Sequence, residues 1–284
     1  MTVPVLAILG TKGGVSKSTL SMGLAIWISK LRPDDRCLLI DGDMHVRSVE
    51  LKMCRVHDAT LKDVLTREKP WESAVYTCEL EDENGELLYP KLAVLPAGGR
   101  FMPPMRESPL TYLEMAKRLF GNMIEGLRKE FKYIIIDTPA SVGFEHFILT
   151  ASADAVIHVC EPNEDSISSA LATAEELKDL MGVQAIGIVL SRVPADIDAK
   201  PWIEKIKQIA PFFGAIPEDP KVGAAFRENL PVAAAYPETP ASLALKEIAR
   251  KVMGATVRRT DVGAKLERGF ETALQRVKDE KKSS

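Results

Sequence analysis

The sequence predicts an α/β fold of three layers, in which a mostly parallel central sheet is flanked by helices. Short apolar runs alternate with longer amphipathic stretches along most of the chain, which is the pattern of β-α-β units. The 284 residues suit one large domain. With 46% hydrophobic and 27% charged residues, the composition is that of a globular protein and excludes a disordered or disulfide-stapled chain.

The predicted strands are short and rich in Val, Ile and Leu. They cover residues 3–9, 37–40, 92–95, 133–136, 155–160, 185–190 and 212–216, with helices predicted over 18–31, 109–131, 166–181 and 201–210. One antiparallel pair is expected, because 75–80 and 86–89 flank an acidic turn that ends in Asn84-Gly85. We predict a surface hairpin inserted beside the sheet at about 75–90.

The composition changes after about Gly254, which divides a domain of residues 1–254 from a tail of residues 255–284. The tail carries net charge +3, whereas the first 256 residues carry −6. Its apolar residues recur at spacings of three and four, which predicts a basic amphipathic helix. They are Val262, Leu266, Phe270, Ala273, Leu274 and Val277.

Several classes of protein are excluded by what the sequence lacks. No apolar run is long enough to span a membrane, and the N-terminus lacks the basic start and cleavage site of a signal peptide, so we expect a soluble, cytoplasmic protein. The four cysteines are widely separated and form no zinc-type spacing, so we expect buried free thiols. A net charge of −3 argues against a general nucleic-acid binder.

The strongest motif lies between the first predicted strand and the first predicted helix. It reads Gly10-Thr11-Lys12-Gly13-Gly14-Val15-Ser16-Lys17-Ser18-Thr19. Glycines let backbone N–H groups turn toward phosphates, the following helix presents its positive N-terminus, Lys17 adds a point charge, and the Ser18 hydroxyl can ligate Mg²⁺. The motif predicts a nucleotide phosphate loop. A plain glycine-rich turn would explain neither Lys17-Ser18 nor Lys12.

This loop resembles the deviant Walker A motif KGGxGK[ST] of the MinD/ParA family of P-loop ATPases, matched over residues 12–18, and the chain is most similar to MinD-like members. The resemblance covers about residues 3–253. It implies the P-loop NTPase fold, with ATP and Mg²⁺ as ligands. It also implies a homodimer closed around two ATP molecules, in which Lys12 reaches the phosphates bound by the other subunit, as an arginine finger does elsewhere.

Three positions depart from the family pattern. Thr11 stands where a strict loop has its first glycine, Ser16 replaces the glycine before the loop lysine, and Ser141 replaces a later glycine. A Cβ at Ser16 crowds the phosphates or disfavours a positive φ. We therefore expect nucleotide binding with slow turnover.

The segment after the strand 37–40 resembles the family's switch I. It contains Asp41, Asp43, Arg47 and Glu50 at the family's spacing. The resemblance implies that Asp41 lies near the metal shell, that Asp43 orients the hydrolytic water, and that Arg47 and Glu50 face the partner subunit. A helix N-cap is the alternative role for Asp43.

The strand 133–136 ends in Asp137, and the following residues resemble the family's switch II. Carboxylates at the C-terminal ends of parallel strands beside a phosphate loop are placed to hold Mg²⁺ and its waters. The predicted metal ligands are thus Ser18, Asp41 and Asp137, and the predicted catalytic residues are Lys12, Lys17 and Asp43.

Adenine is the predicted base. Pro194 stands where a GTPase has the guanine-reading Asp of its NKxD segment. Arg192 could stack on the base, with an exposed loop cation as its alternative role. Residues Pro217, Glu218 and Asp219 resemble the family's IPED segment. Together with the loop residues Thr11, Gly13, Gly14, Val15, Ser16, Lys17, Ser18 and Thr19, these complete the predicted nucleotide-binding set.

The resemblance implies an ATP-dependent dimerisation switch that positions or recruits a partner protein and hydrolyses ATP slowly, with stimulation by that partner. A nucleotide-holding scaffold without turnover is the alternative. A DNA-partitioning role is disfavoured by the acidic body. A small-molecule enzyme of the dethiobiotin synthetase type would need a substrate pocket at the dimer interface, which no residue specifically demands.

The tail leaves two possibilities open. A basic amphipathic helix can bind a membrane surface, and dimerisation would double the number of anchors. Glu267 and Glu271 dilute its charge and Phe270 is its one aromatic residue. Packing onto the protein's own body or onto a partner helix is therefore the favoured alternative.

Overall fold

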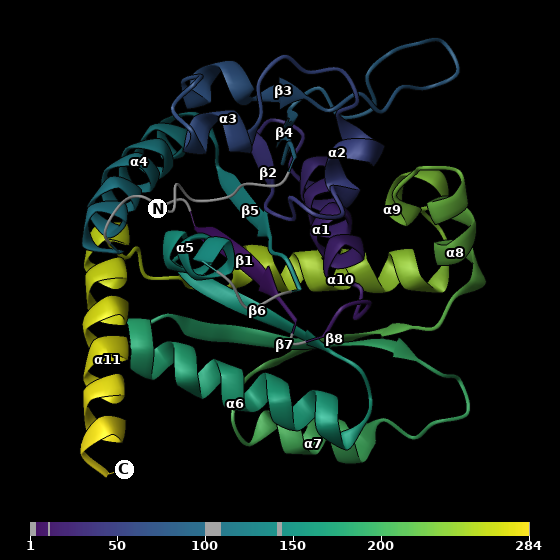
Figure 1. Cartoon of the computed structure of the whole chain (residues 1–284). Helices are drawn as coiled ribbons and strands as arrows, with labels where there is room; N and C mark the ends of the chain where they lie inside the picture. The colour runs from purple at the N-terminus through teal and green to yellow at the C-terminus, as the bar shows by residue number, and fades with distance from the viewer. Residues whose placement is uncertain (1–3, 11, 100–108, 141–143, 284) are drawn as a thin grey trace.

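The computed structural model describes residues 4–10, 12–99, 109–140 and 144–283. Its centre is an eight-stranded sheet in the order β3-β4-β2-β5-β1-β6-β7-β8, in which all neighbouring strands are parallel except β3 and β4 (Figure 1). The strands are β1 (Val5–Leu9), β2 (Cys37–Asp41), β3 (Tyr76–Thr77), β4 (Leu92–Leu95), β5 (Tyr133–Asp137), β6 (Ala155–Cys160), β7 (Gln184–Val193) and β8 (Phe212–Pro217). The predicted fold class is confirmed.

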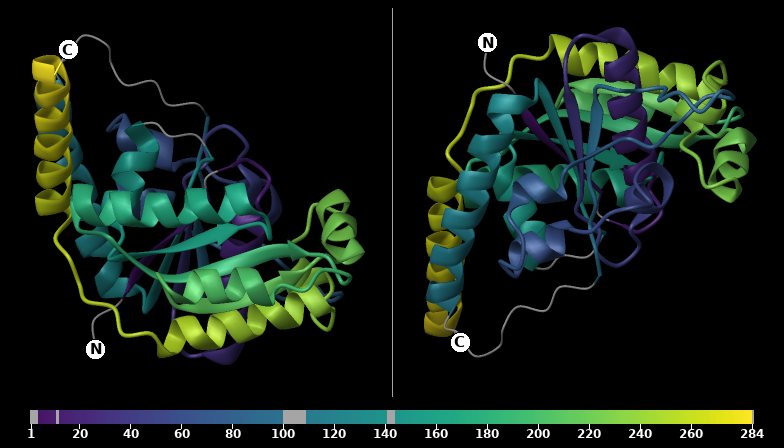
Figure 2. Two further views of the ribbon diagram at one scale, coloured as in Figure 1. Left: turned by 90° about the horizontal axis from the view of Figure 1, so that it is seen from below. Right: turned by 90° about the horizontal axis from the view of Figure 1, so that it is seen from above.

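Helices cover both faces of this sheet (Figure 2). They are α1 (Lys17–Leu31), α2 (Ser48–Met53), α3 (Leu61–Leu65), the 3-10 helix η1 (Trp71–Ala74), α4 (Pro109–Glu130), α5 (Phe144–Ser152), α6 (Glu164–Met181), α7 (Lys200–Lys207), α8 (Pro220–Arg227), α9 (Val232–Ala235), α10 (Pro240–Gly254) and α11 (Val262–Ser283). In the part of the chain that the structure describes, none of them is both long and apolar enough to span a bilayer.

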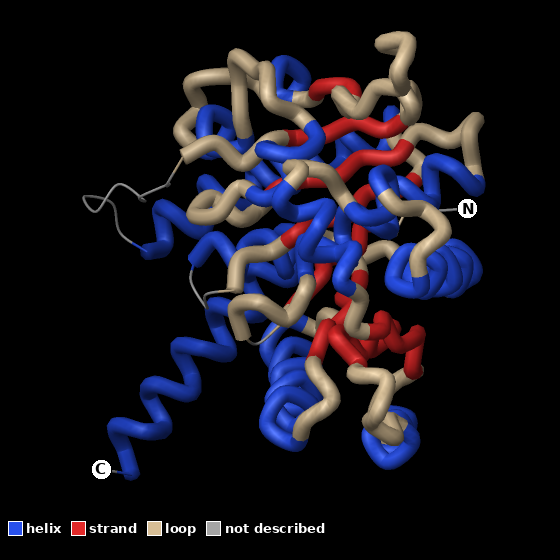
Figure 3. The backbone as a smooth tube through the Cα atoms, turned by 90° about the vertical axis from the view of Figure 1, so that its right-hand side faces the viewer, coloured by secondary structure: helices blue, strands red, loops and turns tan. Residues whose placement is uncertain are grey.

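Successive side chains of each strand point to opposite faces of the sheet, and this alternation creates the two cores between the layers. In β1, Leu6 and Ile8 pack into one core with α1 and α10, whereas Val5, Ala7 and Leu9 pack into the other with α4 and α5. Figure 3 shows the strands running through the middle of the molecule with helices on either side. Because both faces of the sheet are buried, its strands are continuous apolar runs in the sequence.

The sequence predicts these elements closely. Every predicted strand outside the hairpin and every predicted helix is present, with ends within three residues of the predicted ones. The prediction omits η1, α2, α3, α5, α8, α9 and α10.

The segment 75–90 pairs differently from its prediction. The chain turns back as expected, since Leu88 N–H donates to the Leu80 carbonyl. Glu81 and Leu87 form only an isolated bridge, however, and the preceding strand β3 pairs antiparallel with β4. The predicted chain reversal is therefore present, but its two arms form a single β-bridge, and residues 76–77 of the first arm pair with the edge of β4 instead.

The tail helix α11 packs onto the body. It contacts α4, α5 and α6, with Val262 and Leu266 buried and Phe270 packed against the same core. Leu274 is 44% exposed, and the last turns run beyond the rest of the molecule (Figure 3). Of the two possibilities left open by the sequence, this arrangement uses the first three residues of the apolar stripe, Val262, Leu266 and Phe270, for packing onto the protein itself.

Candidate functional site

The predicted phosphate loop joins β1 to α1 at the C-terminal edge of the sheet. Residues 12–14 are exposed, and Val15 is buried below them. No backbone N–H of residues 12–16 donates a hydrogen bond to another described residue. These N–H groups are therefore available to phosphate oxygens. Thr11 and Ser141 lie outside the described residues.

Ser16 lies in the left-handed region, with φ of 70° and ψ of 27°. It is the N-cap of α1, yet its hydroxyl makes no capping hydrogen bond. Left-handed backbone costs a residue with a Cβ about 1–2 kcal/mol. The conflict that the sequence suggested at this position is present, and the loop stores that strain.

We expect Ser16→Gly to raise the free energy of unfolding by about 1 kcal/mol, because glycine adopts this conformation freely. ATP should also bind more tightly, because loss of the Cβ lets the phosphates approach the loop more closely. Chemical denaturation and nucleotide titration measure the two effects. Arg67→Gly is the matched control, because Arg67 is exposed and has φ of 63°. It should gain stability without any change in ATP affinity. Equal ATP affinity in wild type and Ser16→Gly would contradict crowding of the phosphates by the Cβ of Ser16.

A buried cluster lies at the start of α1. Ser18 Oγ donates to Asp137 Oδ2 at 2.6 Å, and Ser21 Oγ lies 2.8 Å from Asp137 Oδ1. Burial raises the pKa of Asp137 to about 6, against the opposing effects of the two hydroxyls and Lys17. Lys17 is only 7% exposed. Burial lowers its pKa, while Asp137 and Asp43 oppose that shift. The structure thus brings three predicted site residues, Lys17, Ser18 and Asp137, together.

Asp41 is the register partner of Asp137 on the neighbouring strand, so both reach the same edge of the sheet. Its Oδ2 accepts the N–H groups of Val49 at 3.2 Å and Glu50 at 2.9 Å, and its Oδ1 accepts that of Asp43 at 3.1 Å. Burial raises the pKa of Asp41 well above its usual value, with the nearby Asp137 adding to the shift. The carboxylate therefore caps α2, and its place in a metal shell stays a prediction.

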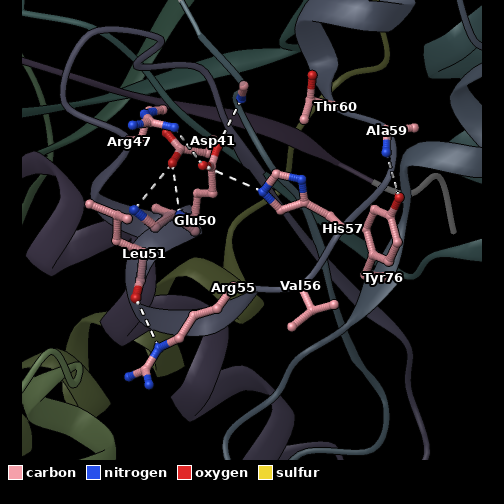
Figure 4. A network of polar contacts seen from close by, with 12 residues as sticks. Asp41, Arg47, Glu50, Leu51, Arg55, Val56, His57, Ala59, Thr60 and Tyr76 are labelled. Carbon is pink, nitrogen blue, oxygen red and sulfur yellow. Dashed lines mark hydrogen bonds and ion pairs between the residues drawn. The ribbon is translucent and has the colours of Figure 1, made fainter.

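Glu50 lies inside the protein and is 4% exposed. Its Oε1 lies 3.1 Å from a guanidinium nitrogen of Arg47 and 3.4 Å from Nε2 of His57, and its Oε2 accepts Gly98 N–H at 2.8 Å (Figure 4). The expectation that Glu50 faces a partner subunit is wrong for this conformation, because its carboxylate is used to hold the switch I segment onto the body.

Asp43 begins the switch I turn. Its Oδ1 accepts the N–H groups of His45 and Val46, both at 3.1 Å, while its Oδ2 accepts no hydrogen bond from a described residue. The N-cap of α2 is Arg47, so the helix-cap alternative for Asp43 is wrong. One carboxylate oxygen therefore stays available at the edge of the sheet that carries the loop.

The oxygen atoms of this cluster suit Mg²⁺. Ser18 donates its proton to Asp137, so the hydroxyl lone pairs remain for an ion. Mg²⁺ prefers oxygen ligands, keeps several waters, and is usually held by one or two carboxylates together with substrate phosphates. Among the described residues no group of three or more His, Cys, Asp or Glu forms a protein-only site. The donor set therefore fits an ion shared with nucleotide phosphates.

The predicted base contacts lie together at the ends of β7 and β8. Glu218 N–H donates to the Val193 carbonyl at 2.9 Å, and Val193 is in register with Pro217. Arg192 is exposed, and its guanidinium lies 3.4 Å from Glu161 Oε1. Both proposed roles of Arg192, stacking on a base and loop cation, remain compatible with this position.

Both carboxylate oxygens of Asp219 accept hydrogen bonds from the helices around it. Its Oδ1 accepts Lys221 N–H at 2.9 Å and its Oδ2 accepts Ala241 N–H at 3.1 Å. The side chain therefore caps α8 and meets the start of α10, which leaves main-chain atoms for any contact with adenine.

Sequence reasoning missed two residues that hold the loop. Ser191 Oγ donates to the Val15 carbonyl at 2.9 Å, and Thr138 Oγ1 donates to the Ile8 carbonyl at 2.7 Å. Each is a small polar residue at the end of an otherwise apolar strand. That local signal could have identified them.

Comparison with known proteins shows the family of this chain. The family model described as "AAA domain" matches residues 3–181. An uncharacterized ATP-binding protein of Methanocaldococcus jannaschii is 34% identical over 88% of each chain. The septum site-determining protein MinD of Helicobacter pylori is 26% identical over 96% of this chain and 98% of its own.

A solved structure shares the fold. The septum site-determining protein MinD of Pyrococcus horikoshii, complexed with Mg-ADP, superposes with a TM-score of 0.70 and 22% identity over 88% of this chain and 95% of that one. The family match, the relatives and the fold lead to one conclusion: this chain belongs to the MinD/ParA-like P-loop ATPases.

Proposed function

We propose that this protein is a dimerisation switch driven by ATP and Mg²⁺, which recruits a partner protein and reverts by slow hydrolysis of ATP. The observation that carries the proposal is the contrast between the two lysines of one loop. Lys17 is buried against Asp137, whereas Lys12 is exposed. Among the described residues, no carboxylate lies within 4.0 Å of Lys12. A cation held away from its own carboxylates is suited to the phosphates of a second subunit.

Several of the predicted residues have a part in this function. Lys17 and the loop N–H groups would bind the phosphates, and Ser18 with Asp137 would hold Mg²⁺, which neutralises charge on the phosphate oxygens when bound. Asp43 would orient water through its unoccupied oxygen. The hydrogen bonds of Ser191 and Thr138 fix the loop and the adjacent strand so that these groups keep their positions.

The proposal is tested by molar mass measured with light scattering after gel filtration, with and without ATP and Mg²⁺. The wild-type mass should double with ATP, and Lys12→Ala should stay monomeric while retaining most of its ATP affinity. Lys91→Ala, at an exposed lysine before β4, is the control and should dimerise normally. A wild-type mass that does not change with ATP would refute the switch.

A scaffold that holds nucleotide without turnover is the second candidate, and the strained φ of Ser16 favours it. Release of phosphate in the presence of Mg²⁺ separates the two functions. Dimerisation with no phosphate release would support the scaffold. The packing of α11 on the body weakens a membrane role, and the acidic body weakens a DNA role.

A further inference from the structure

A cavity of about 470 Å³ lies at the N-terminal ends of β6 and β7, the opposite edge of the sheet from the phosphate loop. The end of α6 forms one wall, and residues 256–268 form another. Figure 2 shows the connection between α10 and α11 passing along this edge of the molecule. None of the residues of the nucleotide site lines the cavity.

Asp154 fixes the walls of this cavity in place. Its Oδ2 accepts Val5 N–H at 2.9 Å, and its Oδ1 accepts Thr260 N–H at 2.8 Å. The guanidinium of Arg128 lies 2.8 Å from the same Oδ1 and compensates its charge. The connection to α11 is thus attached to the sheet, and the ion pair of Asp154 is made with Arg128, which does not line the cavity.

Three cations line the cavity without an ion pair among the described residues. Lys265 is 5% exposed and donates to the Ala153 carbonyl. Arg268 donates to the Asp179 carbonyl at 3.1 Å. Arg258 is exposed and has no carboxylate within 4.0 Å in the described part of the chain. Arg258 and Arg268 are exposed, whereas Lys265 is buried next to a backbone carbonyl, which is unfavourable for its charge and makes the cavity attractive to an anion.

The remaining charged side chains of the cavity already have partners within the protein. Arg259 is paired with Glu125. Asp261 Oδ1 accepts Ala264 N–H at 2.7 Å at the start of α11. With Asp261 counted against the three free cations, the cavity keeps two positive charges within a domain whose first 256 residues are acidic.

We propose that this cavity binds a small organic phosphomonoester. A phosphate monoester carries about −1.5 to −2 charges at pH 7, which matches the two uncompensated positive charges, and guanidinium groups bind its oxygens with two parallel hydrogen bonds. Met181, Ile186 and Val257 supply apolar surface for the organic part. The volume lies within the range of small-molecule sites. A bound ligand would join α11 to α6 and hold the tail on the body.

The experiment is calorimetric titration of the full chain with 1-naphthyl phosphate, which joins a phosphomonoester to an apolar ring. We expect one site in the wild type and at least tenfold weaker binding in the double variant Arg258→Gln, Arg268→Gln. Lys17→Met should bind the probe as the wild type does, because the phosphate loop is a separate site. Arg276→Gln, on the same helix but paired with Glu176 outside the cavity, is the matched control and should also be unchanged.

Four results would overturn the proposal: no saturable binding by the wild type, unchanged binding by the double variant, loss of binding in Lys17→Met, or equal affinity for 1-naphthol or inorganic phosphate. The last would show that only one half of the ligand is recognised. Circular dichroism confirms that each variant is folded.

Proton uptake gives a second readout that a folding defect would not imitate. Burial lowers the pKa of Lys265 to about 8, with Asp154 and Asp261 opposing the shift and Arg128 adding to it. An anion beside the ammonium raises that pKa, so binding at pH 8 should take up protons. Binding enthalpies in buffers of different ionisation enthalpy measure the uptake. Binding without proton uptake at pH 8 would place the anion away from Lys265.

Discussion

Replacing Lys17 by methionine is expected to lower the affinity for ATP and Mg²⁺ by about 10- to 10²-fold, because a hydrogen bond to a charged group contributes about 1.5–3 kcal/mol. The physical reason is the burial of Lys17. Its ammonium is already desolvated beside Asp137 and Asp43, so its charge acts on a phosphate through a medium of low polarity. The measurement is fluorescence titration with a labelled ATP analogue.

Methionine is chosen because it keeps the apolar stem of Lys17. That stem packs under Gly10, where an added Cβ would lie 3.1 Å from Lys17 Cγ. Lys30→Met is the control on the same helix, since Lys30 donates to the Ala233 carbonyl at 3.4 Å, away from the loop. It should bind ATP as the wild type does. An affinity within threefold of wild type for Lys17→Met, in a folded protein, would contradict the assignment of the phosphate loop.

Local patterns predict the elements that carry this site. The strands of the parallel sheet are buried on both faces and therefore appear as short apolar runs, and the loop after β1 is continuous in sequence. Asp41 and Asp137 each follow such a run, so parallel register alone brings them to one edge. These parts of the site could be predicted because each depends on a few consecutive residues.

The parts that sequence reasoning missed depend on contacts between distant segments. The family resemblance implies that Glu50 of switch I faces a partner subunit, but it is buried and contacts His57 and Gly98, which come from other loops. The pairing of β3 with β4 depends on the free edge of the sheet rather than on the hairpin turn. Side-chain roles of this kind follow from tertiary packing, which periodicity does not encode.

The tail illustrates the same limit. Spacings of three and four predict the helix and its apolar stripe, but amphipathicity is equally suited to a lipid surface and to a protein core. The contacts of Val262 and Leu266 with the core decide between them in this conformation. Lys265 lies between these two residues in the sequence and is also buried, which a helical pattern of polar and apolar residues does not predict.

Replacing Asp43 by asparagine is expected to slow ATP hydrolysis by about 10²- to 10⁴-fold, the range for loss of a group that activates or orients a reacting water. The amide oxygen of asparagine can still accept the N–H groups of His45 and Val46, so the switch I turn should keep its shape while losing the charge. ATP affinity and the ATP-dependent dimer mass should therefore change little. Phosphate release under single-turnover conditions measures the chemical step.

Asp58→Asn separates this effect from a general loss of charge, because Asp58 is exposed and lies after switch I. It should hydrolyse ATP at the wild-type rate. If Asp43→Asn also hydrolysed ATP at the wild-type rate, another group at the same edge would have to orient the water. A fall in ATP affinity equal to the fall in rate would instead show that Asp43 acts by organising the loop, because a residue that works only on the attacking water leaves the bound nucleotide unaffected.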